Sequence, residues 1–262
     1  MLKIFISEGV ELKKTAKKQL KGNWAWAIGL AFISQFIIGF LVGFNKQVWT
    51  QGLQFSELDP GQKIGFVLCS TLIGIFISAI ILWGVTYSVL AFRDDQKKKP
   101  NIFKATFAAF GNGNYAKTLK TSFLTNLFMT LWGILFIIPG IIKAYSYSLT
   151  PYIMKDMIDY NHEMTTTEAI NESKKIMKGH KGELFLLDLS FIGWAILVFF
   201  PIYFGLIMIV MGAIIRTSDS AGMILLILGF VVSLWLAPYY RQTKANYYRN
   251  LVGDKFTNKS EN

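Results

Sequence analysis

Residues 64–92 read IGFVLCSTLIGIFISAIILWGVTYSVLAF, a run that contains no Asp, Glu, Lys, Arg or His. The run is longer than the roughly 20 residues that a helix needs to cross the hydrocarbon core of a bilayer. Strands of a membrane barrel would be shorter and would alternate polar with apolar residues, so the pattern predicts a transmembrane helix. Two more runs without charged residues, 24–44 and 220–240, predict the same structure.

The composition agrees with a membrane protein. Hydrophobic residues make up 53% of the chain and charged residues 16%, against roughly 25% charged residues in a typical soluble domain. The net charge of +11 could indicate a nucleic-acid partner, but a basic membrane protein more often owes its charge to cytoplasmic loops that face anionic lipid, and we prefer that explanation. We therefore predict an all-α, polytopic helical bundle without a nucleic-acid partner.

The apolar region 121–154 is too long for one simple span and is interrupted by Pro139 and Gly140. One interpretation is a tight hairpin of two spans, 121–138 and 139–154, that turns at these two residues. The other is a single crossing followed by an outside loop. Both halves of the hairpin are short, so 139–154 either spans fully or is re-entrant.

The distribution of basic residues favours the hairpin. With six spans, both termini share a side with the loops 93–120 and 155–183, and that side carries 23 Lys and Arg against 3 on the other. Basic residues concentrate in cytoplasmic loops, which predicts that both termini are cytoplasmic. The predicted organisation is a cationic segment 1–23, a six-span domain 24–240 and a cytoplasmic tail 241–262.

The fifth predicted span, 184–215, is longer than a bilayer requires. It contains Pro201, and a tilt or a kink at this proline would absorb the excess length.

The segment 8–21 predicts a cationic amphipathic helix on the inner leaflet, because Leu12, Ala16 and Leu20 repeat at helical spacing among lysines. The lysines expected to face lipid are Lys13, Lys14, Lys17, Lys18 and Lys21. Anionic inner-leaflet lipids are accordingly predicted partners, with a protein partner or a homo-oligomer as further expectations.

Two shorter helices are predicted in the loops. Asn101 is placed to cap a helix that turns Phe103, Phe107 and Phe110 towards the membrane. Further along, Thr165 and Glu168 have the spacing of a capping box.

The sequence contains fragments of motifs for catalysis or cofactor binding, but each lacks the surrounding residues that the chemistry requires. The string G-x-G-x-x-A at 111–116 lacks the preceding strand of a dinucleotide site, so it predicts a turn. The histidines His162 and His180 and the single Cys69 do not have the spacing of a zinc site. We expect no cofactor, no metal and no enzymatic activity.

Lys143 and Asp188 are the ionisable residues expected within the membrane. Such residues are costly in hydrocarbon and by default suggest function. We favour structural polar packing, with Tyr145, Tyr147 and nearby hydroxyl groups as partners; the alternative is a substrate or proton path. In the six-span arrangement the two residues sit near opposite faces, so a direct salt bridge is not expected.

Several motifs together resemble a known family. They include Lys21-Gly-Asn-Trp24, the string IIPGIIKAYSYS at 137–148 and the string LFLLDLSF at 184–191. They resemble the bacterial integral-membrane family called domain of unknown function 975, with a looser similarity to the membrane domain fused to some glycerophosphodiester phosphodiesterases. The resemblance implies a multi-pass bacterial membrane protein and no particular activity.

Two hypotheses of function follow. The first is a non-enzymatic protein that organises, senses or regulates at the inner leaflet through its lysine-rich segments. The second is a transporter or export component for a small amphipathic or lipid-like molecule, since broken spans can line binding sites. An embedded enzyme ranks third, because the spans contain no Ser-Lys pair, His cluster or paired carboxylates.

Overall fold

Every regular element in the described part of the chain is an α-helix, as the sequence predicts. The computed structural model describes residues 2–52, 58–111, 113–160, 165–215, 220–253 and 255–256, so His162 lies outside the described residues. The helices are α1 (Leu2–Leu20), α2 (Trp24–Gly52), α3 (Pro60–Asp94), α4 (Ile102–Thr106), α5 (Tyr115–Leu135), α6 (Ile137–Tyr147), α7 (Thr150–Asp159), α8 (Glu168–Ile176), α9 (Lys181–Leu189), α10 (Ile192–Ile215) and α11 (Ser220–Val252).

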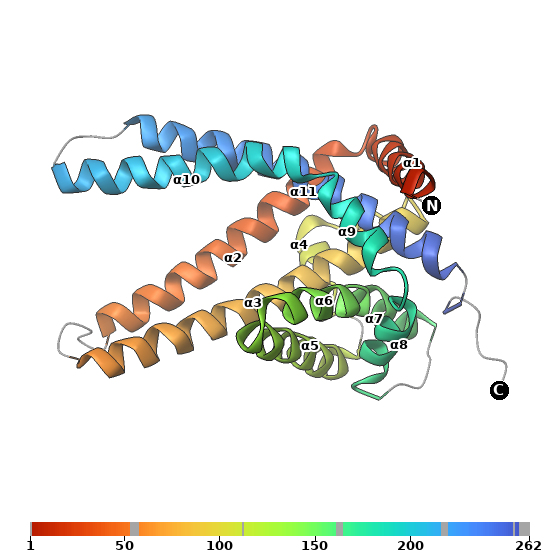
Figure 1. Cartoon of the computed structure of the whole chain (residues 1–262), viewed down its shortest axis with the longest axis horizontal. Coiled ribbons are helices and arrows are strands. Elements are labelled where there is room, and N and C mark those ends of the chain that lie inside the picture. The colour runs from red at the N-terminus through yellow and green to blue at the C-terminus, as the bar shows by residue number, and fades with distance from the viewer. Residues whose placement is uncertain are drawn as a thin grey trace.

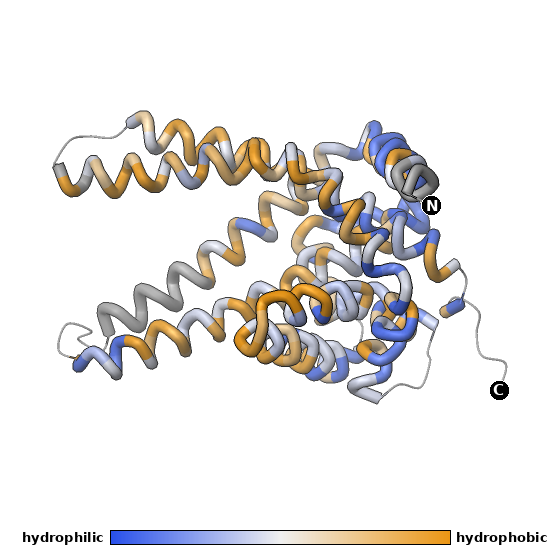
Figure 2. The backbone as a smooth tube through the Cα atoms, viewed as in Figure 1, coloured by the Kyte–Doolittle hydropathy of each residue, from blue (hydrophilic) through white to orange (hydrophobic). Residues whose placement is uncertain are grey.

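Four of the described helices are long and apolar enough to cross a membrane, where the sequence predicts six spans. They are α2, α3, α10 and α11. Figure 1 shows them as two pairs, α2 with α3 and α10 with α11, which extend in the same direction from the remaining helices and diverge from each other. In Figure 2, α10 and the first half of α11 are largely hydrophobic, as is the α5–α6 hairpin. The pairs therefore supply the four candidate membrane-spanning helices of the described chain.

The region predicted to be the third and fourth spans forms a shorter hairpin. The chain reverses at Phe136, between α5 and α6, and not at Pro139 and Gly140 as predicted. Pro139 lies in the first turn of α6, where a missing backbone N–H costs no helical hydrogen bond. With 11 residues, α6 is only about 16 Å long, roughly half of a hydrocarbon core. The predicted span 139–154 is instead two short helices, α6 and α7.

The hairpin tip is strongly apolar and exposed. Ile134 and Ile137 are each 77% exposed, and Phe136 between them is 64% exposed. Gly140 allows the two arms to approach, because a Cβ atom there would lie 2.9 Å from the Cα of Gly133. The hairpin is thus a tightly packed unit with an apolar end.

The predicted fifth and sixth spans also differ from the helices observed. The segment 184–215 is divided between α9 and α10 at Ser190 and Phe191, so a change of helix absorbs the length that a kink at Pro201 was expected to absorb. The sixth helix continues beyond residue 240 as part of α11, with Pro238 inside it. Apolar length thus locates the spans but not the helix ends.

Local capping signals are better predicted. The Asn101 side chain accepts a hydrogen bond from the backbone of Phe103 at 3.1 Å, which confirms the predicted start of α4. Only half of the predicted capping box before α8 forms: the Glu168 carboxylate accepts from the Thr165 backbone at 3.1 Å. A box absent from the prediction opens α3, where Asp59 and Gln62 each accept from the other's backbone N–H.

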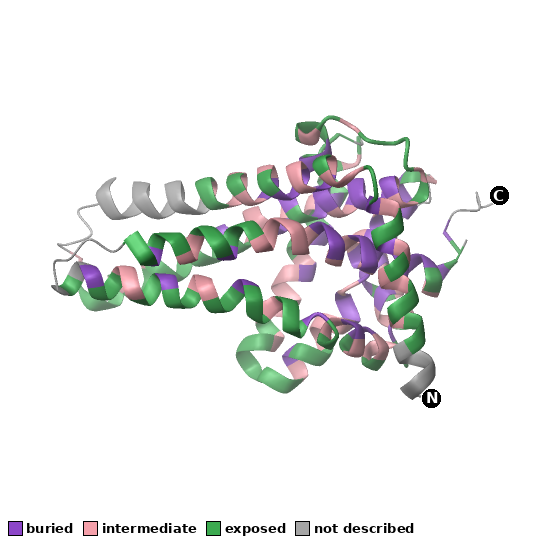
Figure 3. Cartoon of the chain, turned by 90° about the horizontal axis from the view of Figure 1, so that it is seen from above, coloured by how far each residue is buried: buried purple, intermediate pink, exposed green. Residues whose placement is uncertain are grey.

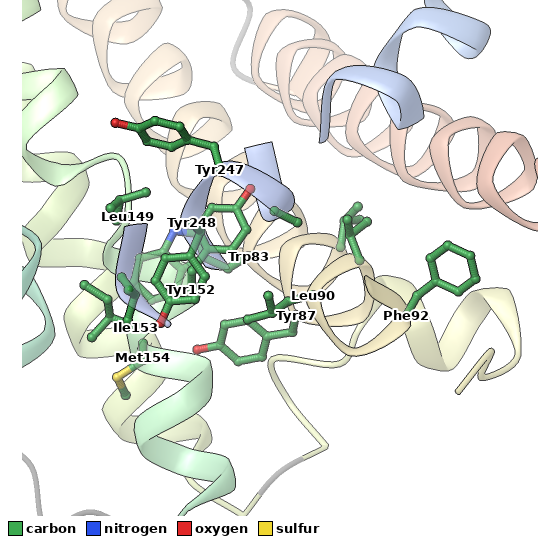
Figure 4. Close-up of a cluster of buried hydrophobic side chains, with 14 of the residues drawn as sticks. Trp83, Tyr87, Leu90, Phe92, Leu149, Tyr152, Ile153, Met154, Tyr247 and Tyr248 are labelled. Atoms are coloured by element: carbon green, nitrogen blue, oxygen red, sulfur yellow. The ribbon is translucent and has the colours of Figure 1, made fainter. Parts of the chain in front are cut away.

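The buried core lies at one end of the molecule. In Figure 3, buried residues concentrate where the short helices meet α1, α3 and the C-terminal half of α11, whereas the long pairs are largely exposed. Part of this core appears in Figure 4, where Tyr152 of α7 and Tyr248 of α11 lie together with ring centroids 5.1 Å apart. The last part of α11 is therefore a central element of the core.

Candidate functional site

Asp188 lies near the end of α9, close to the junction with α10. Its Oδ2 accepts a hydrogen bond from the Tyr145 hydroxyl at 3.1 Å, and its Oδ1 accepts one from the Tyr240 hydroxyl at 2.9 Å. The two tyrosines come from α6 and α11, so the carboxylate joins three helices. The sequence predicts Asp188 as a polar centre with Tyr145 among its partners; Tyr240, at the end of an apolar run, was not foreseen.

A cavity of about 560 Å³ begins at Asp188 and Tyr240. Its walls are mostly apolar and come from α9, α10 and α11, including Phe191, Val198 and Leu236. We call it the Asp188 groove. Its volume is within the range of small-molecule sites, which are typically apolar with a few polar groups that fix orientation.

The far side of the Asp188 groove has one more polar pair. Gln35 of α2 and Ser233 of α11 both line it, and the Ser233 hydroxyl donates to the Gln35 side-chain oxygen at 3.3 Å. Because Gln35 belongs to the other long pair, the groove reaches the region where the two pairs converge in Figure 1.

Lys143 and Tyr147 occupy a different place from Asp188. The Lys143 ammonium lies 4.8 Å from the ring centroid of Trp132, across the α5–α6 hairpin. Tyr147 is 4% exposed, and the Lys174 ammonium of α8 lies 5.5 Å from its ring centroid. The described ion pairs include neither Lys143 nor Asp188. The structure thus does not bring the predicted intramembrane charges together.

Helix α1 packs against the protein along the stripe that the sequence predicts for the membrane surface. Ala16 and Leu20 are fully or almost fully buried, at 0% and 1% exposure. The Lys13 ammonium donates to the backbone oxygen of Ser190 at 2.9 Å and lies 4.1 Å from the Phe191 ring centroid. Burial, and secondarily the neighbouring Lys17, lower the pKa of Lys13.

The other lysines of the segment 8–21 are more exposed than Lys13. Lys14, Lys18 and Lys21 are exposed, whereas Lys17, also exposed, places its ammonium 5.4 Å from the ring centroid of Tyr239. The protein therefore holds α1 in place through its apolar stripe and Lys13. Lys14, Lys18 and Lys21 point to solvent, and Lys14 pairs at the surface with Glu11 at 3.9 Å.

The sequence does not predict the cluster of charges that the described residues form around Asp156, which is 1% exposed. Arg249 of α11 donates two hydrogen bonds to the Asp156 carboxylate, at 2.5 and 2.7 Å, and further ones to Asp94 at the end of α3. The Tyr248 hydroxyl donates to Asp156 at 2.6 Å. Asp156 lies one helical turn beyond Tyr152 on the apolar face of 150–159, but the charges around it in the sequence hide this position.

A second polar cluster connects α1 to α11. The side-chain oxygen of Gln19 accepts from Gln242 at 2.8 Å and from Asn246 at 3.0 Å. The Asn246 oxygen in turn accepts from Arg93 at 3.2 Å. These bonds and the Arg249 cluster are structural: they satisfy polar groups within the core and fix the C-terminal part of α11 against α1, α3 and α7.

The residues of the Asp188 groove are suited to binding a ligand that has a polar and an apolar part. Asp188 offers a carboxylate, Tyr145 and Tyr240 orient it, and the walls offer apolar contact. Among the described residues, no three of the types His, Cys, Asp and Glu gather in the manner of a metal site. His180, the described histidine, contacts Glu183 at 2.9 Å beside a different cavity, between α1 and α9.

Four long apolar helices joined to a helical polar end are the architecture of an all-helical membrane protein. The model of the family described as protein of unknown function (DUF975) matches residues 6–149 and 134–255, so the chain belongs to that family. No curated protein and no solved structure matches the chain. The looser similarity to phosphodiesterase membrane domains stays a prediction.

Proposed function

We propose that the protein is a non-enzymatic organising or regulatory protein of the bacterial cytoplasmic membrane, which engages anionic lipids of the inner leaflet through α1. Both termini would be cytoplasmic, the two long pairs would cross the bilayer, and the α5–α6 hairpin would enter it part way. Two helical pairs return the chain to its starting side, as the excess of basic residues on that side requires.

The observation that carries the proposal is the way α1 is held. Its apolar stripe is buried in the protein, so the helix does not depend on lipid to fold. Lys14, Lys18 and Lys21 are exposed on α1 and just after it, in the segment that leads into Trp24, where the first long apolar helix begins. Basic groups near an anionic membrane surface each contribute about 1 kcal/mol to its attraction. A preformed basic helix at the membrane boundary is suited to reading lipid charge.

Lipid binding to the full-length protein tests this proposal. Native mass spectrometry from neutral detergent should count more bound phosphatidylglycerol than phosphatidylcholine. Changing Lys14, Lys18 and Lys21 to Gln together should reduce that preference at least about tenfold, since three surface charges are lost, and high salt should weaken it in the wild type.

The matched control changes three lysines of the α8 region, Lys174, Lys175 and Lys178, to Gln. In Figure 1, α8 lies on the opposite side of the short helices from α1. The control should keep the lipid preference. An equal loss in both triple variants, or equal binding of the two lipids by the wild type, would contradict a role of α1 in lipid recognition.

The Asp188 groove favours a second candidate, a carrier of a small amphipathic molecule. A polar end and apolar walls match such a molecule, and the groove lies where the two long pairs converge. Flux of a labelled amphiphile in reconstituted vesicles tests this candidate, with Asp188→Asn as the comparison. Transport that is equal in empty vesicles would exclude it.

A further inference from the structure

The acceptor capacity of Asp188 is only partly used. A carboxylate has about four lone-pair positions, and Tyr145 and Tyr240 each donate one hydrogen bond to it. None of the ion pairs within 4.0 Å formed by the described residues includes Asp188. A carboxylate at the edge of hydrocarbon is costly without a countercharge. The residue is therefore prepared to accept a hydrogen-bonding cation.

The walls of the Asp188 groove suit an apolar tail attached to the cationic head of a ligand. Phe191, Val198 and Leu236 supply apolar surface, and Ile192 and Phe199 line the groove while remaining 54% and 68% exposed. Both exposed residues belong to α10, which is apolar enough to cross a membrane from Ile192 onward. A ligand could therefore enter from the bilayer with its tail along α10.

We propose that the Asp188 groove binds a single-chain amphiphile with a primary-amine head, the ammonium at the Asp188 carboxylate and the tail against α10 and α11. Charge complementarity selects the ammonium, since the polar atoms lining this end are the carboxylate and the Tyr240 hydroxyl. The proposal deepens the carrier candidate, because it names the ligand class of the same groove. Binding can be measured without transport, so a failure of transport and a failure of amine binding are distinguishable.

Lys244 is the cation that could compete for Asp188. It lies one helical turn after Tyr240, its ammonium is 5.8 Å from the Tyr240 ring centroid, and it feels the charge of Asp188. It is not among the residues that line the Asp188 groove, and it makes no ion pair within 4.0 Å. Lys244→Gln should therefore not weaken amine binding; a weaker site in that variant would contradict the proposal.

Photolabelling of the full-length protein in phosphatidylcholine nanodiscs tests the site. The probe is a dodecylamine with a diazirine in its tail, compared with the alcohol and the carboxylate of the same tail. The amine should label peptides of α10 and α11 saturably, and unlabelled dodecylamine should compete. The alcohol and the carboxylate should label them at least about tenfold less, because a charge-assisted hydrogen bond is stronger than a neutral one.

Variants separate the carboxylate from the rest of the groove. Asp188→Asn should lower amine labelling about tenfold or more, for the same electrostatic reason. Glu183→Gln removes a carboxylate from the same helix, but from a residue that lines the α1–α9 cavity, and should leave labelling unchanged. Ala195→Phe narrows the groove without replacing Asp188 and should also reduce amine labelling. If Asp188→Asn fails to fold, wild-type amine labelling of Ala195→Phe would overturn the proposal.

Wild-type labelling of Asp188→Asn would overturn the proposal. So would equal labelling by amine and alcohol, or labelling confined to helices other than α2, α9, α10 and α11, which line the groove. A groove occupied by an ordinary phospholipid would give labelling that does not respond to Asp188→Asn, and it would overturn the proposal in the same way.

Discussion

Asp156 is the most deeply buried charged residue in the described core. Its side chain is 1% exposed and accepts from both Arg249 and Tyr248, while Arg249, itself 8% exposed, also binds Asp94. Such a cluster does not guarantee net stability over an apolar replacement, but removing one member leaves a buried charge without its partner. The cluster thus fixes how the end of α11 meets α3 and α7.

Asp156→Asn should lower the free energy of unfolding by about 3 kcal/mol, the magnitude expected when one partner of a buried pair is lost. Asp159→Asn, on the same helix, removes an ion pair between Asp159 and Lys155. The Asp159 side chain is 48% exposed. That control should change the free energy by no more than about 1 kcal/mol. Equilibrium unfolding of both variants in SDS, followed by tryptophan fluorescence, checks this; equal effects would show that the Arg249 cluster is not central to stability.

Among single residues, the sequence reveals the charges that interrupt apolar runs. Asp188 and Lys143 stand out in that way, and both contact aromatic side chains. Asp156 and Arg249 do not stand out, because they lie in segments whose many charges indicate cytoplasmic loops. Only the packing of α7 against α11 makes these two charges part of a core.

The elements show a similar division between local and tertiary information. The Asn101 cap is a local signal, and α4 begins where it predicts. The reversal at Phe136 depends on how α5 and α6 pack. Pro139 and Gly140 have the sequence signature of a break, but they lie inside α6. Gly140 is needed for contact with α5 and not for the turn, since its Cβ would meet Gly133.

Gly140→Ala should separate the arms of the α5–α6 hairpin. The added Cβ would lie 2.9 Å from the Cα of Gly133 and 3.1 Å from the backbone oxygen of Trp132, and backbone atoms cannot swing aside. We expect a loss of about 1–3 kcal/mol in unfolding free energy, as for other overpacked contacts. Thermal unfolding in detergent measures it.

Gly133→Ala is the matched control, because a Cβ there meets nothing within 4 Å. It should be neutral or slightly stabilising, since alanine favours helix over glycine by up to about 1 kcal/mol. If Gly133→Ala were the more damaging change, the described packing of α5 against α6 would be incorrect.

For the whole molecule, hydropathy predicts the all-helical class and the location of four spanning helices. It does not separate a crossing hairpin from one that enters part way, because both are apolar. The 11 residues of α6 are too few to cross a hydrocarbon core, and together with the exposed apolar tip around Phe136 they support our proposal that the hairpin enters part way. The lipid-facing lysines are likewise visible in the sequence, whereas the protein contacts that bury the apolar stripe of α1 depend on α11 and α9.

Cysteine accessibility in intact cells most directly tests the central claim, that two long pairs cross the membrane and the α5–α6 hairpin does not. In a Cys69→Ser background, single cysteines replace Ser56, Phe136 or Lys178, and a membrane-impermeant maleimide is added from outside. We predict labelling at position 56 and none at 136 or 178 until the membrane is opened. Outside labelling at position 136 would show that the hairpin crosses the bilayer, and outside labelling at 178 would contradict the proposed orientation altogether.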